Sequence, residues 1–271
     1  MTEISQDTRS IAKAMTIAGS DSGGGAGIQA DLKTFAALGV YGTSVLTAIT
    51  AQNTVGVTAV HEIPTDVIIA QIEAVISDIG ANAVKTGMLS SSGIVKVVAL
   101  ELERHRVDNL VVDPVMVAKS GDSLLKDEAV EALRTQLIPL ASVVTPNIPE
   151  AEVLTGLTIT SSGDTRQAAQ QIVAMGAGSV VVKGGHLDGP ATDLFYDGSS
   201  FQEFTAARIE TANTHGTGCT FASAVAAGLA QGKNVIDAVA QAKEYVTDAI
   251  RASFPIGRGH GPLNHFYNLW H

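Results

Sequence analysis

The chain of 271 residues has little of several features that mark whole classes of protein. Its one cysteine, Cys219, excludes an internal disulfide framework and a zinc site built from cysteines. There are 17 Lys and Arg against 27 Asp and Glu, and the net charge of −10 argues against a surface for nucleic acid or an anionic membrane. No apolar run approaches the ~18 residues of a membrane span, and the polar N-terminus lacks the apolar block of a secretory signal. We therefore expect a cytoplasmic protein without nucleic-acid or membrane partners.

Several nucleotide and hydrolase motifs are also absent. Gly232-Lys233-Asn234 lacks the hydroxyl residue and upstream spacing of a phosphate-binding P-loop, and no GxSxG or HExxH motif occurs. Gly25–Ala30 fits the dinucleotide pattern GxGxxA, but no acidic residue follows between Asp31 and Glu62 to bind a ribose. The glycine loop can instead be a tight strand–helix turn, or a substrate loop with Asp31 on the helix that follows.

Short apolar, Val-rich segments alternate with helical patterns along most of the chain, which predicts an α/β protein with a mostly parallel sheet and helices on both faces. We expect a single domain over residues 14–271 after a disordered tail of residues 1–13. The expected strands are 14–18, 42–50, 57–61, 81–85, 109–113, 142–145 and 179–183, with a hairpin of 194–196 and 201–204. The expected helices include 28–38, 67–79, 91–106, 127–137, 165–175 and 235–250.

The stretch Thr214–Ala230 is a glycine turn that runs into a small, apolar helix. The first N–H groups of a helix have no partner within it and carry partial positive charge, so a turn that aims them at one point can bind an anion. Cys219 lies at this helix start, where a thiol is shifted toward thiolate. The segment is either an anion site with a tunable base or a tightly packed glycine turn with a structural cysteine.

Ligands of open α/β sheets bind beyond the carboxyl ends of the strands, and polar residues of this chain gather there. Asp113 follows one predicted strand, and Glu150 lies in the first turn of a helix after another. Both could bind magnesium, although Glu150 taken alone is better explained as a charge favoured at a helix start. Lys183, at a further strand end, could neutralise a phosphate or lie in water as a charge of the rim.

Eight segments occurring in order over nearly the whole chain resemble the hydroxymethylpyrimidine and phosphomethylpyrimidine kinases, within the ribokinase-like superfamily. Because ordered motifs are far more specific together than singly, this resemblance carries the functional prediction. The segments are Thr16–Thr34, Ala51–Thr54, Lys85–Leu89, Asp113–Met116, Lys119–Asp122, Thr145–Glu150, Lys183–His186 and Thr214–Thr220.

The resemblance implies a three-layer fold and ATP-dependent phosphorylation of 4-amino-5-hydroxymethyl-2-methylpyrimidine, and commonly of its monophosphate. It implies Cys219 as the base, with the N–H groups of Gly216, Thr217 and Gly218 holding the charge of the transferred phosphoryl group. It implies a homodimer. A related branch of pyridoxal kinases shares nearly all motifs but departs at Gln52-Asn53, so pyridoxal kinase or dual specificity is the alternative.

The same resemblance assigns the remaining site residues. Gln52 would bind the aminopyrimidine edge, with five further residues completing its pocket: Gly19, Ala26, Asp31, Met88 and Val115. Asp113 and Glu150 would organise Mg²⁺. The nucleotide and its phosphates would be bound by Asn147, Lys183, Gly185 and Thr214. Two polar segments, Leu187–Ala191 and Ala118–Ser123, are candidate lids.

Overall fold

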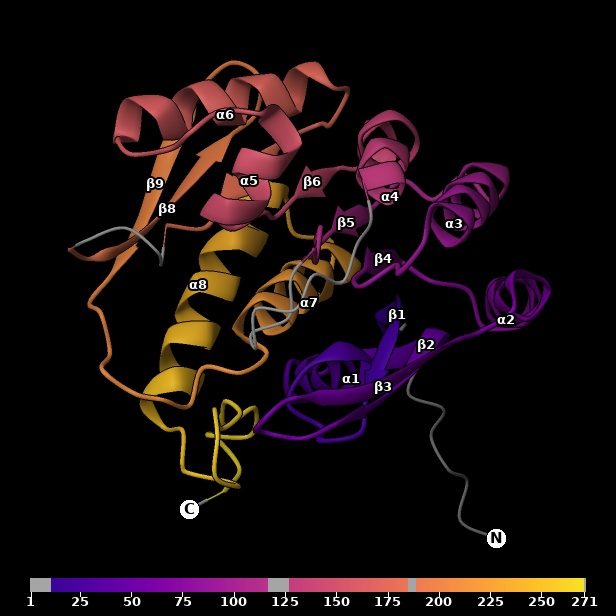
Figure 1. Cartoon of the computed structure of the whole chain (residues 1–271), viewed down its shortest axis with the longest axis horizontal. Coiled ribbons are helices and arrows are strands. Elements are labelled where there is room, and N and C mark those ends of the chain that lie inside the picture. Colours follow the sequence, from indigo (N-terminus) through magenta and orange to yellow (C-terminus); the bar gives the residue numbers. More distant parts are fainter. Residues whose placement is uncertain (1–10, 117–126, 185–188, 271) are drawn as a thin grey trace, which may run out of the picture.

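The computed structural model describes residues 11–116, 127–184 and 189–270, and its nine strands form one sheet (Figure 1). The strand order is β3-β2-β1-β4-β5-β6-β7-β8-β9. The strands are β1 (Lys13–Asp21), β2 (Tyr41–Gln52), β3 (Val57–Glu62), β4 (Ala83–Thr86), β5 (Leu110–Val112), β6 (Val143–Val144), β7 (Val180–Val182), β8 (Ala191–Tyr196) and β9 (Phe201–Ala206). The six strands from β2 to β7 in this order are parallel, and β3, β8 and β9 are antiparallel additions at the two edges.

Helices cover both faces of the sheet, as expected (Figure 1). One face carries α1 (Gly27–Ala37), α7 (Thr217–Ala230) and α8 (Val235–Arg251); the other carries α2 (Thr65–Asp78), α3 (Ser92–Arg104), α4 (Asp127–Ala132), α5 (Ile148–Thr155) and α6 (Ser162–Ala174). The central strands alternate between the two cores: Val111 packs toward α7 and α8, whereas Val112 packs toward α2–α6. The three layers follow from strands that are apolar on both faces.

Most predicted elements are present, with ends that differ by a few residues. The expected helix 127–137 is an α-helix only to Ala132 and continues as a π-helical turn (Leu133–Leu137) and a 3₁₀ turn (Ile138–Leu140). Pro139 lies in that last turn and cannot supply the N–H of a regular helix. Of the predicted tail, residues 1–10 lie outside the described residues, and β1 already begins at Lys13.

Because all described strands belong to one sheet, we propose that residues 14–271 form one domain. No helix of the described residues is both long and apolar enough to cross a membrane. The parallel strands place their carboxyl ends along one edge, and the loops after β1, β2, β4, β5, β6 and β7 meet there.

Candidate active site

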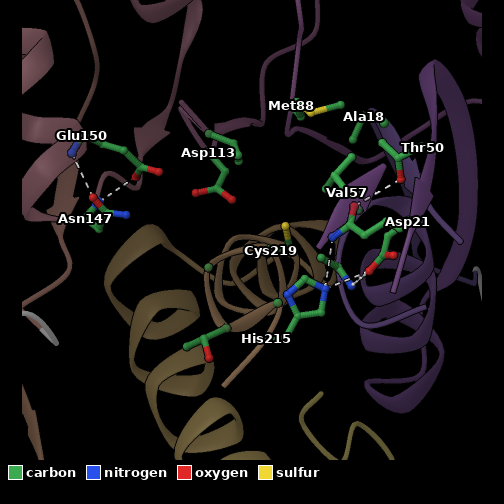
Figure 2. Close-up of a pocket in the computed structure, with 18 of the residues that line it drawn as sticks. Ala18, Asp21, Thr50, Val57, Met88, Asp113, Asn147, Glu150, His215 and Cys219 are labelled. Carbon is green, nitrogen blue, oxygen red and sulfur yellow. Dashed lines mark hydrogen bonds and ion pairs between the residues drawn. The ribbon is translucent and has the colours of Figure 1, made fainter. Parts of the chain in front are cut away.

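A cavity of about 570 Å³ opens at this edge, between the two glycine-rich turns. Figure 2 shows Cys219 between two groups of side chains, with Asp21, Thr50 and His215 on one side and Asn147 and Glu150 on the other. We call the first group the acceptor half and the second group the phosphate half, after the phosphoryl acceptor and the phosphates that the family resemblance predicts there. The cavity lining includes most of the residues predicted for the site: Gly19, Ala26, Gln52, Met88, Val115, Asp113, Asn147, Glu150, Lys183, Thr214, Gly216, Thr217, Gly218 and Cys219.

The two glycine turns touch each other, and their glycines are required for that contact. Gly216 has φ = 81° at the start of α7, and a Cβ there would overlap the carbonyl oxygen of Gly25. Gly27 has φ = 56°, and a Cβ on it would overlap the Gly19 carbonyl oxygen. The turns therefore need glycine both for backbone conformation and for close approach, which brings the start of α7 beside the loop after β1.

Asp21 organises the loop after β1. Its carboxylate accepts hydrogen bonds from the backbone N–H groups of Gly23 (2.8 Å), Gly25 (3.1 Å) and Ala26 (2.9 Å). It also lies 2.9 Å from Nε2 of His215. Burial raises the pKa of Asp21, but the His215 contact and the backbone donors outweigh burial, so the pKa is lowered and the group is a carboxylate.

Gln52 lies at the end of β2 and faces this network. Its backbone is tied to the first glycine loop, because Ser22 Oγ donates to the Gln52 carbonyl oxygen (2.6 Å) and accepts from its N–H (2.8 Å). Its amide lies 3.4 Å from His215 Nε2 and 3.1 Å from Thr50 Oγ1. Sequence reasoning did not select Asp21, Thr50 or His215, although His215 lies within the second glycine motif.

Asp31 is placed differently from the prediction. It is fully buried and is not among the cavity-lining residues, because its carboxylate is behind the wall of the pocket. Its carboxylate accepts hydrogen bonds from Thr16 Oγ1 (2.6 Å) and Ser223 Oγ (2.7 Å). Lys85 Nζ donates to both of its oxygens (3.0 and 2.9 Å). The predicted direct contact of Asp31 with substrate is therefore corrected to a contact with Lys85, which does line the cavity.

Lys85 is fully buried beneath the cavity floor. Burial lowers the pKa of its ammonium group, but the charges of Asp31, Cys219 and Asp113 raise it, and the net shift is upward. Lys85 is therefore a fixed cation whose charge is matched by the Asp31 carboxylate. Four hydrogen bonds, two of them from Lys85 itself, hold that carboxylate in place. The prediction from sequence did not include Lys85 among the site residues, although Lys85 begins the segment Lys85–Leu89, which is one of the eight that carry the family resemblance.

The thiol of Cys219 differs from the prediction in its ionisation. Burial raises its pKa to about 11, and the carboxylates Asp31 and Asp113 add to that shift, while Lys85 and a backbone contact with Gly27 act in the opposite direction. The expected shift toward thiolate is therefore wrong for the free protein. A helix start favours the thiolate, but here low polarity and two nearby carboxylates outweigh it.

The phosphate half is built on Asp113, Lys183 and Glu150. Lys183 Nζ lies 3.0 Å from Asp113 Oδ1, while Asp113 Oδ2 is buried and has no hydrogen-bond partner among the residues that the structure describes. A Cβ on Gly218 would lie 3.2 Å from Lys183 Nζ, so the start of α7 directly adjoins this ion pair. Burial lowers and the two carboxylates raise the pKa of Lys183, with a net upward shift.

Asn147 and Glu150 form a capping box at the start of α5. Asn147 Oδ1 accepts from the Glu150 N–H (2.9 Å), and the Asn147 N–H donates to Glu150 Oε2 (2.8 Å). Burial raises the pKa of Glu150 to about 7; Lys183 opposes this shift and Asp113 reinforces it. Above a pH of about 7, where Glu150 is ionised, the described residues of the phosphate half hold two carboxylates, Asp113 and Glu150, against the one ammonium group of Lys183.

Three predicted positions fall wholly or partly outside the described residues. Gly185 and the candidate lid 118–123 are outside them. Of the candidate lid 187–191, residues 187–188 are outside and Ala191 is the first residue of β8.

The two glycine turns, the Cys219 thiol and the Asp113–Lys183 ion pair meet at the carboxyl edge of a three-layer sheet, and this architecture is the ribokinase-like fold of small-molecule kinases. The sequence model of the phosphomethylpyrimidine kinase family matches residues 21–264, and the chain belongs to that family. It is 51% identical over 259 residues to the hydroxymethylpyrimidine/phosphomethylpyrimidine kinase of Bacillus subtilis, covering 95% of this chain and 96% of that protein.

Two other comparisons widen the family. The chain is 54% identical over 252 residues to the thiamine biosynthesis bifunctional protein ThiED of Geobacter sulfurreducens; the match covers 93% of this chain and 51% of that longer protein. Among solved structures, an ADP complex of Bacillus subtilis pyridoxal kinase has a TM-score of 0.89 and 45% sequence identity, covering 94% of this chain and 98% of that one. The fold is therefore shared by kinases named for two different acceptors.

Proposed function

We propose that this chain transfers the γ-phosphoryl group of ATP to 4-amino-5-hydroxymethyl-2-methylpyrimidine, and to its monophosphate, in thiamine diphosphate biosynthesis. The observation that supports this most strongly is the arrangement of the cavity, with the Gln52 amide in the acceptor half, the Asp113–Lys183 pair in the phosphate half, and Cys219 between them. The name of the Bacillus subtilis relative, at 51% identity over nearly all of both chains, supports the same acceptor.

Within this proposal, the acceptor half orients the pyrimidine. Gln52 pairs with the aminopyrimidine edge, and Met88, Val115, Gly19 and Ala26 enclose the ring. A Cβ on Gly19 would lie 2.5 Å from Met88 Cε, so that glycine keeps Met88 against the cavity. The hydroxymethyl group then faces Cys219, whose thiolate form accepts the hydroxyl proton as the oxygen attacks the γ-phosphorus and ADP leaves.

The phosphate half and the start of α7 stabilise the charge that develops on the transferred group. The N–H groups of Gly216, Thr217 and Gly218 lie at the start of this helix, beside Lys183, and are assigned to the transferred phosphoryl group. Lys183, Asn147 and Thr214 are assigned to the nucleotide and its phosphates, together with Gly185.

The phosphate half fits a magnesium ion. The buried, unpartnered Asp113 Oδ2 is an oxygen ligand of the kind that Mg²⁺ prefers, and the Glu150 carboxylate adds negative charge beside it. Bound there, the ion would neutralise phosphate charge. Both oxygens of Asp113 would then have a partner.

The alternative acceptor is pyridoxal, which is supported by the 45% identity to a pyridoxal kinase. Gln52 favours the pyrimidine, because an amide can donate to a ring nitrogen and accept from an adjacent amino group at once. Purified protein with Mg²⁺ and ATP is assayed against the pyrimidine alcohol, its monophosphate and pyridoxal. We expect turnover of the first two, and activity on pyridoxal alone would contradict the proposal.

A homodimer and a cytoplasmic location complete the proposal. The edge strand β3 is exposed at five of its six residues, and the neighbouring Ile49 of β2 is 48% exposed. An exposed edge strand of this kind, with Val60 on its surface and Ile49 beside it, is a suitable interface between two copies. Sedimentation of the purified chain tests the dimer.

A further inference from the structure

The Gln52 amide has two side-chain neighbours, and the orientation of the amide decides whether each neighbour faces a donor or an acceptor. Gln52 Nε2 lies 3.4 Å from His215 Nε2, and Gln52 Oε1 lies 3.1 Å from Thr50 Oγ1. An amide nitrogen can only donate, and an amide oxygen can only accept. The identity of the two neighbours therefore decides which way the amide must face.

His215 Nε2 must carry a hydrogen. It lies 2.9 Å from Asp21 Oδ2, and Asp21 is an ionised carboxylate that already accepts three backbone N–H groups. Two acceptors at that distance would repel each other, so Nε2 is the donor whether the ring is neutral or charged. The donor end of Gln52 therefore faces another donor.

Thr50 accommodates the same orientation. Its hydroxyl has one hydrogen and lies 2.8 Å from the carbonyl oxygen of Ser20, so when it donates there it offers Gln52 a lone pair. A rotation of the Gln52 amide by about 180° about its Cγ–Cδ bond exchanges the positions of Oε1 and Nε2. Both neighbours are then matched, and no other heavy atom moves. The carbonyl oxygen then shares the Nε2–H of His215 with the nearer Asp21 Oδ2, and the NH₂ group donates to Thr50.

We propose that His215, held by Asp21, fixes the orientation of the Gln52 amide and so makes the pocket select a ring with an amino group beside an acceptor nitrogen. With both outer positions of the amide occupied, one oxygen lone pair and one N–H remain on its inner edge. That edge matches the 4-amino group and N3 of the pyrimidine. The ring cannot turn over, because its hydroxymethyl group must face Cys219. This inference rests on the proposed role of Gln52.

The 4-oxo analogue of the substrate provides the matching probe. In the oxo compound the hydrogen-bonding roles at positions 3 and 4 are reversed, because O4 accepts and N3–H donates. It therefore fits only an amide turned the other way. We expect the wild-type chain to bind the amino compound ~10²-fold more tightly than the oxo compound, since two mismatched hydrogen bonds are involved. Binding is measured by calorimetry without ATP, which keeps the readout independent of turnover.

Three variants at His215 separate the donor from the ring. His215→Gln can place an N–H at the position of Nε2, and we expect it to keep the preference. His215→Asn is too short and His215→Leu has no donor, and for both we expect the ratio of the two dissociation constants to fall below ~10. If the Leu variant does not fold, the Gln and Asn pair still decides the question. Equal unfolding temperatures and equal ADP binding identify folded variants.

The outcomes distinguish this inference from the proposal beneath it. If Gln52→Met binds the amino compound as the wild type does, the assigned role of Gln52 is wrong and the inference is overturned with it. If Gln52→Met weakens binding but His215→Asn and His215→Leu keep the full preference, only the role of His215 is overturned. A His215→Gln variant that loses the preference in a folded protein contradicts the inference as well.

Discussion

The two halves of the cavity handle buried charge in opposite ways. On the acceptor side, Asp31 and Asp21 each accept at least four hydrogen bonds, and Lys85 is paired with both oxygens of Asp31. On the phosphate side, Asp113 Oδ2 has no partner and burial keeps the pKa of Glu150 near 7. The buried charges of the acceptor half are paired in the free protein, whereas the charges of the phosphate half are balanced only when a cation binds.

This difference indicates how the work of the site is divided. A network in which each buried carboxylate is paired holds a rigid shape, which suits recognition of a neutral ring. Unmatched negative charge destabilises the free protein and is relieved on binding Mg²⁺, which suits a site that must take up a metal with a nucleotide. Cys219 lies at the boundary, and its thiol is affected by charges from both sides.

The largest expected effect concerns that boundary. Cys219→Ala is expected to lower kcat by ~10²–10⁴-fold, the usual range for a general base, while the protein still folds. Because the thiol pKa of the free protein is about 11, the thiolate fraction grows with pH through the neutral range, and the wild-type rate should rise with it. Steady-state rates against pH check both points. An unchanged rate, or the same pH dependence in the variant, would remove Cys219 from the mechanism.

The next effect tests whether the acceptor half is complete. Asp31→Asn removes the charge that balances fully buried Lys85, and breaking a buried pair in this way is expected to reduce the free energy of unfolding by ~3–5 kcal/mol. Lys85→Met should have a similar effect, because it leaves Asp31 unpaired. Urea unfolding of each variant measures the loss.

The double variant Asp31→Asn/Lys85→Met is the control for that prediction. It leaves no uncompensated charge, so it should be more stable than the sum of the two single changes indicates. Strict additivity would mean that the two charges do not interact, and the acceptor half would then be no more complete than the phosphate half.

The two halves also differ in how far sequence could describe them. The glycine turns, Cys219 and the edge where the polar residues meet were all predicted, because they depend on local backbone rules and on the direction of parallel strands. The position of Asp31 was not, since an acid in an early turn of a helix is compatible with solvent, substrate or a buried partner. Its partner Lys85 lies 54 residues away, and only the packing of β4 against β1 brings them together.

The ionisation of Cys219 was mispredicted for a related reason. The helix start can be seen in the sequence, but the depth of burial and the nearby Asp31 and Asp113 cannot. A single histidine in a sequence is most often structural, and the contact of His215 with Asp21 joins residues 194 positions apart. Local motifs therefore predicted where the site is, and long-range pairs determine its charges.

A smaller effect tests the excess negative charge of the phosphate half. Glu150 has a folded pKa of about 7 against its ordinary value of 4.5, so between these values the folded state binds more protons than the unfolded chain. The free energy of unfolding of the metal-free protein should therefore fall as pH rises through this window, by up to about 3 kcal/mol.

Glu150→Gln is the control, because its side chain does not titrate. Unfolding in urea at a series of pH values should show a shallower decline for the variant than for the wild type. The same decline in both would show that Glu150 ionises normally and that the phosphate half carries no excess charge.

The smallest effect separates helix stability from function in the phosphate half. Asn147→Ala removes the side chain that caps α5, and we expect a loss of about 1 kcal/mol in the free energy of unfolding. Ser161→Ala is the matched control, because Ser161 and Asp164 form the same kind of capping box at the start of α6, and Ser161 is not among the cavity-lining residues. Both variants should lose similar stability, but only Asn147→Ala should raise the KM for ATP, since Asn147 lines the cavity and positions Glu150. If the two variants affect KM equally, Asn147 acts only as a helix cap and its assignment to the nucleotide is wrong.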